Sequence, residues 1–132
     1  MPDTLYCTIV TPESVALDAR ADFVAVPLYD GEIGIAVDRA PLIGRLGYGE
    51  FRLRREGQVT RYYVDGGFVQ VANNRVTILT GRAIPADQVD QQAAKQIASA
   101  LKRPAPSAET LEIRDRLLAQ ARGQIRVARR AE

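Results

Sequence analysis

Three arginines near the end of the chain are spaced so that they would line up along one side of a helix. Arg122, Arg126 and Arg130 recur at i, i+4 and i+8. The segment 114–130 holds six arginines against one acid, Asp115, and carries a net charge of +5. Guanidinium groups in such a row bind carboxylates or phosphates, which fits an acidic protein groove or a nucleic acid backbone. The alternative is a solvated helix face whose arginines lie beside its apolar stripe.

The residue types that are missing exclude most catalytic chemistry. The 132-residue chain has no histidine and one cysteine, Cys7. It therefore lacks a Ser-His or Cys-His nucleophile pair, an imidazole metal site and an internal disulfide. No glycine is followed by lysine, which excludes a Walker-type phosphate loop. We expect a protein that is not an enzyme, binds no metal and needs no cofactor.

The first 84 residues have the pattern of a β domain. Short alternating or β-branched runs occur at residues 5–10, 51–54, 68–71 and 76–79. Turn-forming pairs stand at residues 30–31, 56–57, 66–67 and 73–74. Strands this closely spaced, with no helical pattern between them, predict an antiparallel sandwich or flattened barrel over residues 1–84. Cys7 lies in one of these strands, where we expect it to be a small buried hydrophobe.

After Pro85 the spacing of apolar residues changes to that of a helix. One expected helix has its apolar face at Val89, Ala93, Ile97 and Leu101, and Asp87 stands at its N-cap position. Two prolines, at 104 and 106, end it. A second expected helix starts near Ser107 and runs to about residue 130, with an apolar stripe at Leu111, Leu118, Ala121, Ile125 and Ala128. Residues 85–132 therefore predict a helical hairpin.

Charge also separates the two parts, and neither has a membrane signal. Residues 1–84 carry nine arginines against ten acids, whereas residues 85–132 carry nine basic residues against six acids. The longest stretch without a charged side chain is nine residues, and a bilayer needs roughly 20 apolar ones. No basic segment followed by an apolar stretch opens the chain. We expect a cytosolic protein, or one attached to a cytosolic assembly.

Several short motifs resemble one known family in order and in spacing. Residues 30–35 read DGEIGI and residues 40–43 read APLI. Together they resemble the GELGI…HAPLL signature of the ε subunit of bacterial F-type ATP synthases. Three further segments resemble the same family. IVTPE at 9–13 resembles its first strand and turn, DGGFV at 65–69 resembles its SGGF(V/L) segment, and VTIL at 76–79 resembles its VTIL strand. The likeness is tight over residues 4–84 and looser over the hairpin.

The resemblance implies a non-catalytic subunit of the rotary stalk. The β-sandwich would bind the γ subunit and stand on the membrane ring of c subunits. The basic hairpin would either fold onto the sandwich or extend toward the catalytic head, where it would meet an acidic loop of the β subunit, beside α, and restrain ATP hydrolysis. The protein would then be peripheral, on the cytoplasmic face of the bacterial inner membrane.

The same resemblance assigns two residues to the c-ring contact. Glu32 matches the acid of the loop that faces the c-ring in the family, although an ordinary turn carboxylate would look the same. Arg39 stands where the family commonly has a histidine, and residues 37–38 replace a Pro-Gly pair. The implied placement on the ring rests mainly on Glu32.

Some family members bind ATP on the folded hairpin, and this chain carries part of that pattern. Asp90 matches the acid of the first helix, and Arg122 and Arg126 match the arginines of the second. Ala93 stands where the first-helix arginine is expected. Losing one charge-assisted phosphate donor costs about 1.5–3 kcal/mol, so the resemblance implies weak ATP binding or none.

A second function remains open from the residues alone. An Arg-rich helix on a small β-barrel would also suit a nucleic-acid-binding module. Against it, the β part has a net negative charge, and its neighbouring tyrosines, Tyr62 and Tyr63, have no lysine cluster beside them. Salt-sensitive retention on heparin or single-stranded DNA would favour this alternative.

Overall fold

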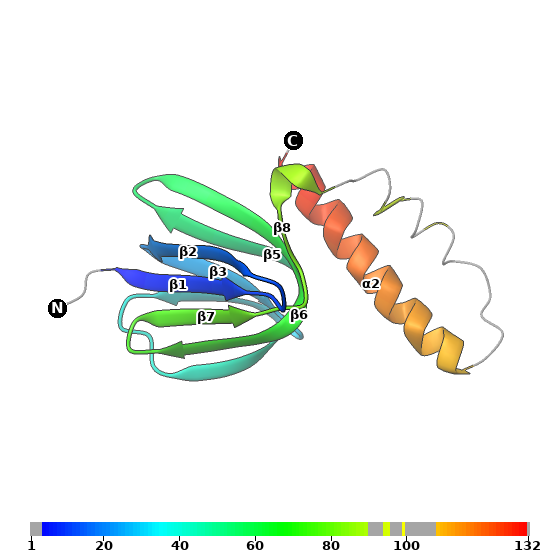
Figure 1. Ribbon diagram of the computed structural model, residues 1–132, viewed down its shortest axis with the longest axis horizontal. Coiled ribbons are helices and arrows are strands. Elements are labelled where there is room, and N and C mark those ends of the chain that lie inside the picture. Colours follow the sequence, from blue (N-terminus) through cyan, green and yellow to red (C-terminus); the bar gives the residue numbers. More distant parts are fainter. Residues whose placement is uncertain (1–3, 90–93, 96–98, 100–107, 132) are drawn as a thin grey trace.

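The computed structural model describes residues 4–89, 94–95, 99 and 108–131. It consists of a β-sandwich with one long helix, α2, lying against it (Figure 1). The predicted fold class, a mainly β N-terminal part followed by a helical part, is confirmed.

Eight strands build the sandwich. They are β1 (Leu5–Val10), β2 (Val15–Ala21), β3 (Phe23–Leu28), β4 (Gly31–Ala36), β5 (Leu42–Arg55), β6 (Gln58–Ala72), β7 (Arg75–Leu79) and β8 (Ala83–Pro85). Their order is β2-β1-β7-β6-β5-β3-β4, and β8 pairs with β6. Every pairing is antiparallel except that of β1 with β7. The strand β4 is therefore an edge strand with a single hydrogen-bonded neighbour, β3.

The core lies inside the sandwich and follows the alternation of the strands. In β1 the residues Leu5, Cys7 and Ile9 are fully buried, and their neighbours in the strand are half-buried. Phe51 and Ile78 are among the largest fully buried side chains of the other strands. Burial raises the pKa of the Cys7 thiol to about 12, which makes it a core residue rather than a reactive one.

Two of the four predicted turns are confirmed, one is displaced by one residue and one is wrong. The turn predicted at Asp30-Gly31 lies at residues 29–30, because Gly31 already pairs with Leu28. The pairs Glu56-Gly57 and Asn73-Asn74 join neighbouring strands with positive φ at both residues, as tight hairpins require. The Gly66-Gly67 pair instead lies inside β6, also with positive φ. A Cβ atom on Gly67 would overlap the carbonyl oxygen of Leu79, so glycine lets β6 bend here beside another strand.

The helical part begins with a single 3-10 turn, η1 (Ala86–Gln88), and ends with α2 (Ala108–Ala131). Asp87 lies within η1, whose own N-cap is Pro85, and Val89 after this turn has an extended backbone, so Asp87 does not directly precede a helix as expected. Most of the first predicted helix, including Asp90 and Ala93, lies outside the described residues, although Ala94, Lys95 and Ser99 are helical. The predicted division between residues 84 and 85 falls within β8 and stays a prediction.

Candidate functional site at the interface of the sandwich and helix α2

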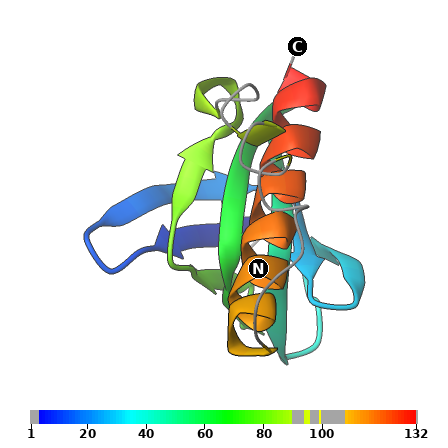
Figure 2. The ribbon, with the colours of Figure 1, turned by 90° about the vertical axis from the view of Figure 1, so that its right-hand side faces the viewer.

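The C-terminal half of α2 packs against the end of the sandwich where β5 and β6 bend, which Figure 2 shows from the side of the helix. Val127 of α2 is fully buried there and forms a small second core with Tyr63 and Ala86. Tyr48, Ile84 and Val89 pack around it. The docked helix is therefore held by a cluster separate from the main core of the sandwich.

Gly123 is the point of closest approach between α2 and the sheet. A Cβ atom placed on it would lie 2.8 Å from the carbonyl oxygen of Tyr48 and 3.2 Å from the ring of Tyr63. The first of these contacts is with backbone, which cannot rotate away. Glycine is unfavourable inside a helix by about 1 kcal/mol relative to alanine, and here it allows direct contact between the helix and strand β5.

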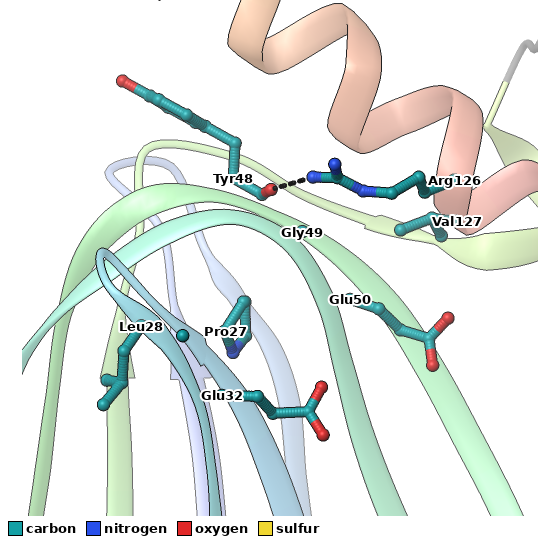
Figure 3. A pocket seen from close by; sticks show the side chains of 9 residues that line it. Pro27, Leu28, Glu32, Tyr48, Gly49, Glu50, Arg126 and Val127 are labelled. Atoms are coloured by element: carbon teal, nitrogen blue, oxygen red, sulfur yellow. Dashed lines mark hydrogen bonds between the residues drawn. The ribbon is translucent and has the colours of Figure 1, made fainter.

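One polar contact lies beside this approach. The guanidinium of Arg126 donates a hydrogen bond to the carbonyl oxygen of Tyr48 at 3.3 Å, as Figure 3 shows. Below that bond is a cavity of about 210 Å³. Its lining includes Glu32 and Glu50 as well as Arg126 and Val127. The cavity thus brings the predicted c-ring carboxylate and a predicted regulatory arginine to the same part of the molecule.

A larger cavity, of about 490 Å³, lies along the same interface. Arg122 and Arg126 line it from α2, and Arg45 and Tyr29 line it from the sandwich. The guanidinium of Arg45 lies over the Tyr29 ring, 4.9 Å from its centroid. Three arginines around one opening make this cavity electropositive, which suits an anionic group.

Tyr63 is the most polar residue of the second core. Its hydroxyl donates to the Oδ1 atom of Asp65 at 3.1 Å, and the guanidinium of Arg82 lies 5.8 Å from its ring centroid. Burial, with the neighbouring Asp65 carboxylate, raises the pKa of the Tyr63 phenol well above its ordinary value. The phenol is therefore neutral and acts as a packed hydrogen-bond donor beneath α2.

Glu32 is the second residue of β4 and forms an ion pair. Its Oε1 atom lies 2.8 Å from Nη2 of Arg52 in β5. The Glu32 side chain is 48% exposed, so it is accessible to a partner while it is held by Arg52. It lies close to the 28–31 turn, at the end of the sandwich that α2 covers.

Arg39 lies at the other end of β4, in the exposed loop that follows the strand. It lies seven positions after Glu32 in the chain, and a strand rises about 3.3 Å per residue, so the two residues do not form a single cluster. Next to Arg39, Asp38 has positive φ and its amide donates to Asn74 Oδ1 at 2.6 Å. That bond fixes the loop against the β6–β7 turn.

The predicted arginine row is only partly visible. Arg122 and Arg126 are exposed, as expected, and both also line the larger cavity. Arg130 belongs to α2 by its backbone, but its side chain is outside the described residues, and so is Asp90. Whether these residues act together stays a prediction.

Two features of the interface were not predicted from the sequence. The buried pair Gly123 and Val127 has the i, i+4 spacing of one helix face and was not part of the predicted apolar stripe. Of that stripe, Ala121 and Ala128 are buried, and Leu118 and Ile125 are half-buried. Arg52 was also missed, because its partner Glu32 lies 20 residues earlier in the chain. The one signal in the sequence for the close approach of α2 to the sheet was a glycine in the interior of an otherwise strong helix.

No group of three or more metal-ligating side chains comes together in the described part of the chain. Likewise, among residues 4–89, 94–95, 99 and 108–131 there is no helix long and apolar enough to cross a membrane.

Comparison with known proteins identifies the family. Residues 4–86 match the family described as ATP synthase, Delta/Epsilon chain, beta-sandwich domain. An ATP synthase epsilon chain from Rhodopirellula baltica is 50% identical over 127 residues, which cover 96% of this chain and 99% of that one. One from Desulfitobacterium hafniense is 35% identical over 96% of both chains. The chain therefore belongs to the delta/epsilon chain family of ATP synthase subunits.

Solved structures have the same fold. A chain in the cryo-EM structure of Euglena gracilis mitochondrial ATP synthase (OSCP/F1/c-ring, rotational state 1) superimposes with a TM-score of 0.85, at 19% identity, over 93% of this chain and 80% of that one. A chain of the Tetrahymena thermophila mitochondrial ATP synthase central stalk and c-ring gives 0.71, at 14% identity, over 94% and 96%.

Within the family, this protein is of the epsilon type, and its partners belong to the ATP synthase complex. None of the comparisons supports the alternative of a nucleic-acid-binding module.

Proposed function

We propose that this chain is a non-catalytic subunit that couples proton flow to ATP synthesis and restrains ATP hydrolysis through its C-terminal helix. The sandwich would bind the γ subunit and stand on the c-ring, at the cytoplasmic face of the bacterial inner membrane. The observation that carries the proposal is the docking of α2: a small cluster around Val127 holds it, while Arg122 and Arg126 remain exposed.

A helix held in this way can exchange between two positions of similar energy. Only part of α2 is buried against the sandwich, and the hydrogen bond from Arg126 to the Tyr48 carbonyl is exposed. Released from the sandwich, the helix would present its arginine row to an acidic loop of the catalytic β subunit, beside α. Each charged contact in a partly dry groove is worth about 1–3 kcal/mol, enough for two or three of them to shift such an equilibrium.

The test is the ATPase activity of the reconstituted complex with and without this subunit. The triple variant Arg122→Ala/Arg126→Ala/Arg130→Ala should inhibit hydrolysis less than the wild type, and high salt should weaken wild-type inhibition in the same way. Arg116→Ala, which removes another exposed arginine of α2, is the matched control and should inhibit normally. Equal inhibition by the wild type and the triple variant at low salt would make the row a solvated face.

For the c-ring contact we propose Glu32 as the main residue and Arg39 as a second one. Glu32 is exposed enough to meet the polar loops of the ring, and Arg39 lies in an exposed loop at the far end of the same strand. Glu32→Lys should impair proton-driven ATP synthesis while hydrolysis by the catalytic head continues. Normal synthesis in this variant would refute the contact.

We also propose that regulatory ATP binding is weak or absent. Arg122 and Arg126 line the larger cavity, so phosphate-binding groups are available at the interface. The arginine expected on the first helix is replaced by Ala93. Titration calorimetry of the isolated subunit with Mg-ATP should give little or no heat of binding, and tight binding would refute this expectation.

A further inference from the structure

Arg52 holds two carboxylates that come from different parts of the sheet. Its Nη2 atom lies 2.8 Å from Glu32 Oε1, and its Nη1 atom lies 3.4 Å from Glu50 Oε1. The planar guanidinium presents several donors in fixed directions, so it can bind both carboxylates at once. Arg52 is thus the link between a residue of the edge strand and a buried carboxylate of β5 on the same face of the sheet.

The register of the strands explains how this link forms. Arg52 in β5 pairs with Ala25 in β3, and Glu32 in β4 pairs with Pro27, two residues further along β3. Residues paired across antiparallel strands point to the same face, as do residues two apart in one strand. All of these side chains therefore lie on one face, and the arginine crosses β3 beside Ala25, which has only a methyl group.

Glu50 is the buried partner of the Arg52 guanidinium. Its side chain is only 6% exposed, and it also pairs with Arg61, whose Nε atom lies 4.0 Å from Glu50 Oε1. A buried carboxylate needs cationic partners, because leaving it uncompensated in the interior is strongly unfavourable. The buried Glu50 carboxylate therefore fixes the position of the Arg52 guanidinium, which does not move with Glu32.

From this geometry we infer that Arg52 is a positioning residue, which anchors the Glu32 carboxylate of the edge strand to buried Glu50. The inference rests on the proposed contact of Glu32 with the c-ring. An edge strand has one hydrogen-bonded neighbour, so an ion pair that crosses that neighbour restricts how the strand can present its side chains. Arg52 sets the direction in which Glu32 faces the ring.

The test uses the complete ATP synthase carrying variants of this subunit, and it measures the initial rate of proton-driven ATP synthesis. Arg52→Met keeps the length of the side chain and removes its charge, whereas Arg52→Lys keeps the charge. The methionine variant should lower synthesis by about two- to fivefold, the range that corresponds to the loss of a partly exposed ion pair. The lysine variant should keep more than half of the wild-type rate.

A double variant and a matched control complete the experiment. Glu32→Gln should lower synthesis as much as Arg52→Met, and the two changes together should do no more than either alone. Arg55→Met is the control, because it breaks the Arg55–Asp22 pair of similar exposure elsewhere in the sandwich, and it should leave synthesis unchanged. Arg52→Met removes one cationic partner of buried Glu50, so its thermal midpoint should lie below that of Arg55→Met. Because a loss caused by poor folding would add to the loss caused by Glu32→Gln, the absence of additivity in the double variant separates positioning from folding.

The possible failures are distinguishable. If Glu32→Gln lowers synthesis but Arg52→Met does not, the c-ring contact stands and the positioning role is overturned. Equal losses with lysine and methionine at position 52, or additive losses in the double variant, would also overturn it. Wild-type synthesis with Glu32→Gln would instead remove the proposed contact itself.

Discussion

Replacing Gly123 with alanine should release α2 from the sandwich. The added methyl group would lie 2.8 Å from the carbonyl oxygen of Tyr48 and 3.1 Å from its carbonyl carbon. Both atoms belong to the backbone of β5, so the helix itself has to move. The hydrogen bond from Arg126 to the same carbonyl and the packing of Val127 would be lost or weakened with it.

Only the overpacking distinguishes the docked from the undocked state. It costs about 1–3 kcal/mol in the docked state. Alanine also stabilises a helix by about 1 kcal/mol relative to glycine, but α2 is helical in both states, so this contribution cancels. The substitution therefore multiplies the ratio of undocked to docked molecules by about 5 to 160.

Distances between two spin labels on the isolated subunit measure this ratio. Cysteines at Arg116 and Gln58, both exposed, place one label on α2 and one on the sandwich. Native Cys7 should stay unlabelled at neutral pH, because it is fully buried and its pKa is about 12. The wild type should give one narrow distance, and Gly123→Ala should give a broad second population at different distances.

Helix propensity alone is controlled by Asp115→Ala, an exposed substitution on the same helix. It should leave the distance distribution close to that of the wild type. In the complete ATP synthase, Gly123→Ala should inhibit hydrolysis more strongly. An unchanged distance distribution in Gly123→Ala would show that the docked position of α2 does not depend on the close approach of Gly123 to the Tyr48 carbonyl.

Three further outcomes test the fold. A chain ending at residue 84 should still unfold cooperatively in urea, because the main core lies within the sandwich and the second core around Val127 is separate; a non-cooperative transition would refute the predicted domain division. The hydrogen bond from the Glu56 amide, and then the Arg55 guanidinium, hold the pKa of the Asp22 carboxyl below its ordinary value. The ionised carboxylate therefore stabilises the fold fully above the unfolded-state pKa of about 3.9. This stabilisation is lost as the pH falls through the lower folded-state pKa. Asp22→Asn should therefore lose less stability between pH 7 and pH 3 than the wild type in urea titrations, and an identical loss would contradict this. Cys7 should react with a thiol reagent at pH 8 only after unfolding, and rapid reaction of the native protein would contradict its burial.

The sequence predicted the class of fold but not the length of its strands. Alternation correctly placed strands around residues 5–10 and 76–79. The Gly66-Gly67 pair was interpreted as a turn, because paired glycines usually end strands. In the structure β5 and β6 pair over most of their length, and the glycines let β6 bend without ending. Whether paired glycines form a turn or a bend within a strand depends on which strand lies beside them. A single sequence does not show which strands are neighbours.

The candidate site was predicted only where helical spacing was sufficient. The arginine row follows from i, i+4 spacing, and Arg122 and Arg126 do lie together on α2. The role of Gly123 depends on which strand the helix meets, and that is a tertiary contact. The bridge from Arg52 to Glu32 depends on the order β5-β3-β4 and on its register. Neither is available before the sheet topology is known.

Co-purification from native membranes tests whether this chain works as a subunit of the ATP synthase. A tagged, full-length chain would be expressed in its own cells and isolated from gently solubilised membranes, and the bound proteins would be identified by mass spectrometry. We expect the α, β, γ and c subunits to be recovered in the ratios of an assembled complex. Recovery of the chain without γ and the catalytic subunits, under conditions in which the rest of the complex stays assembled, would contradict this expectation.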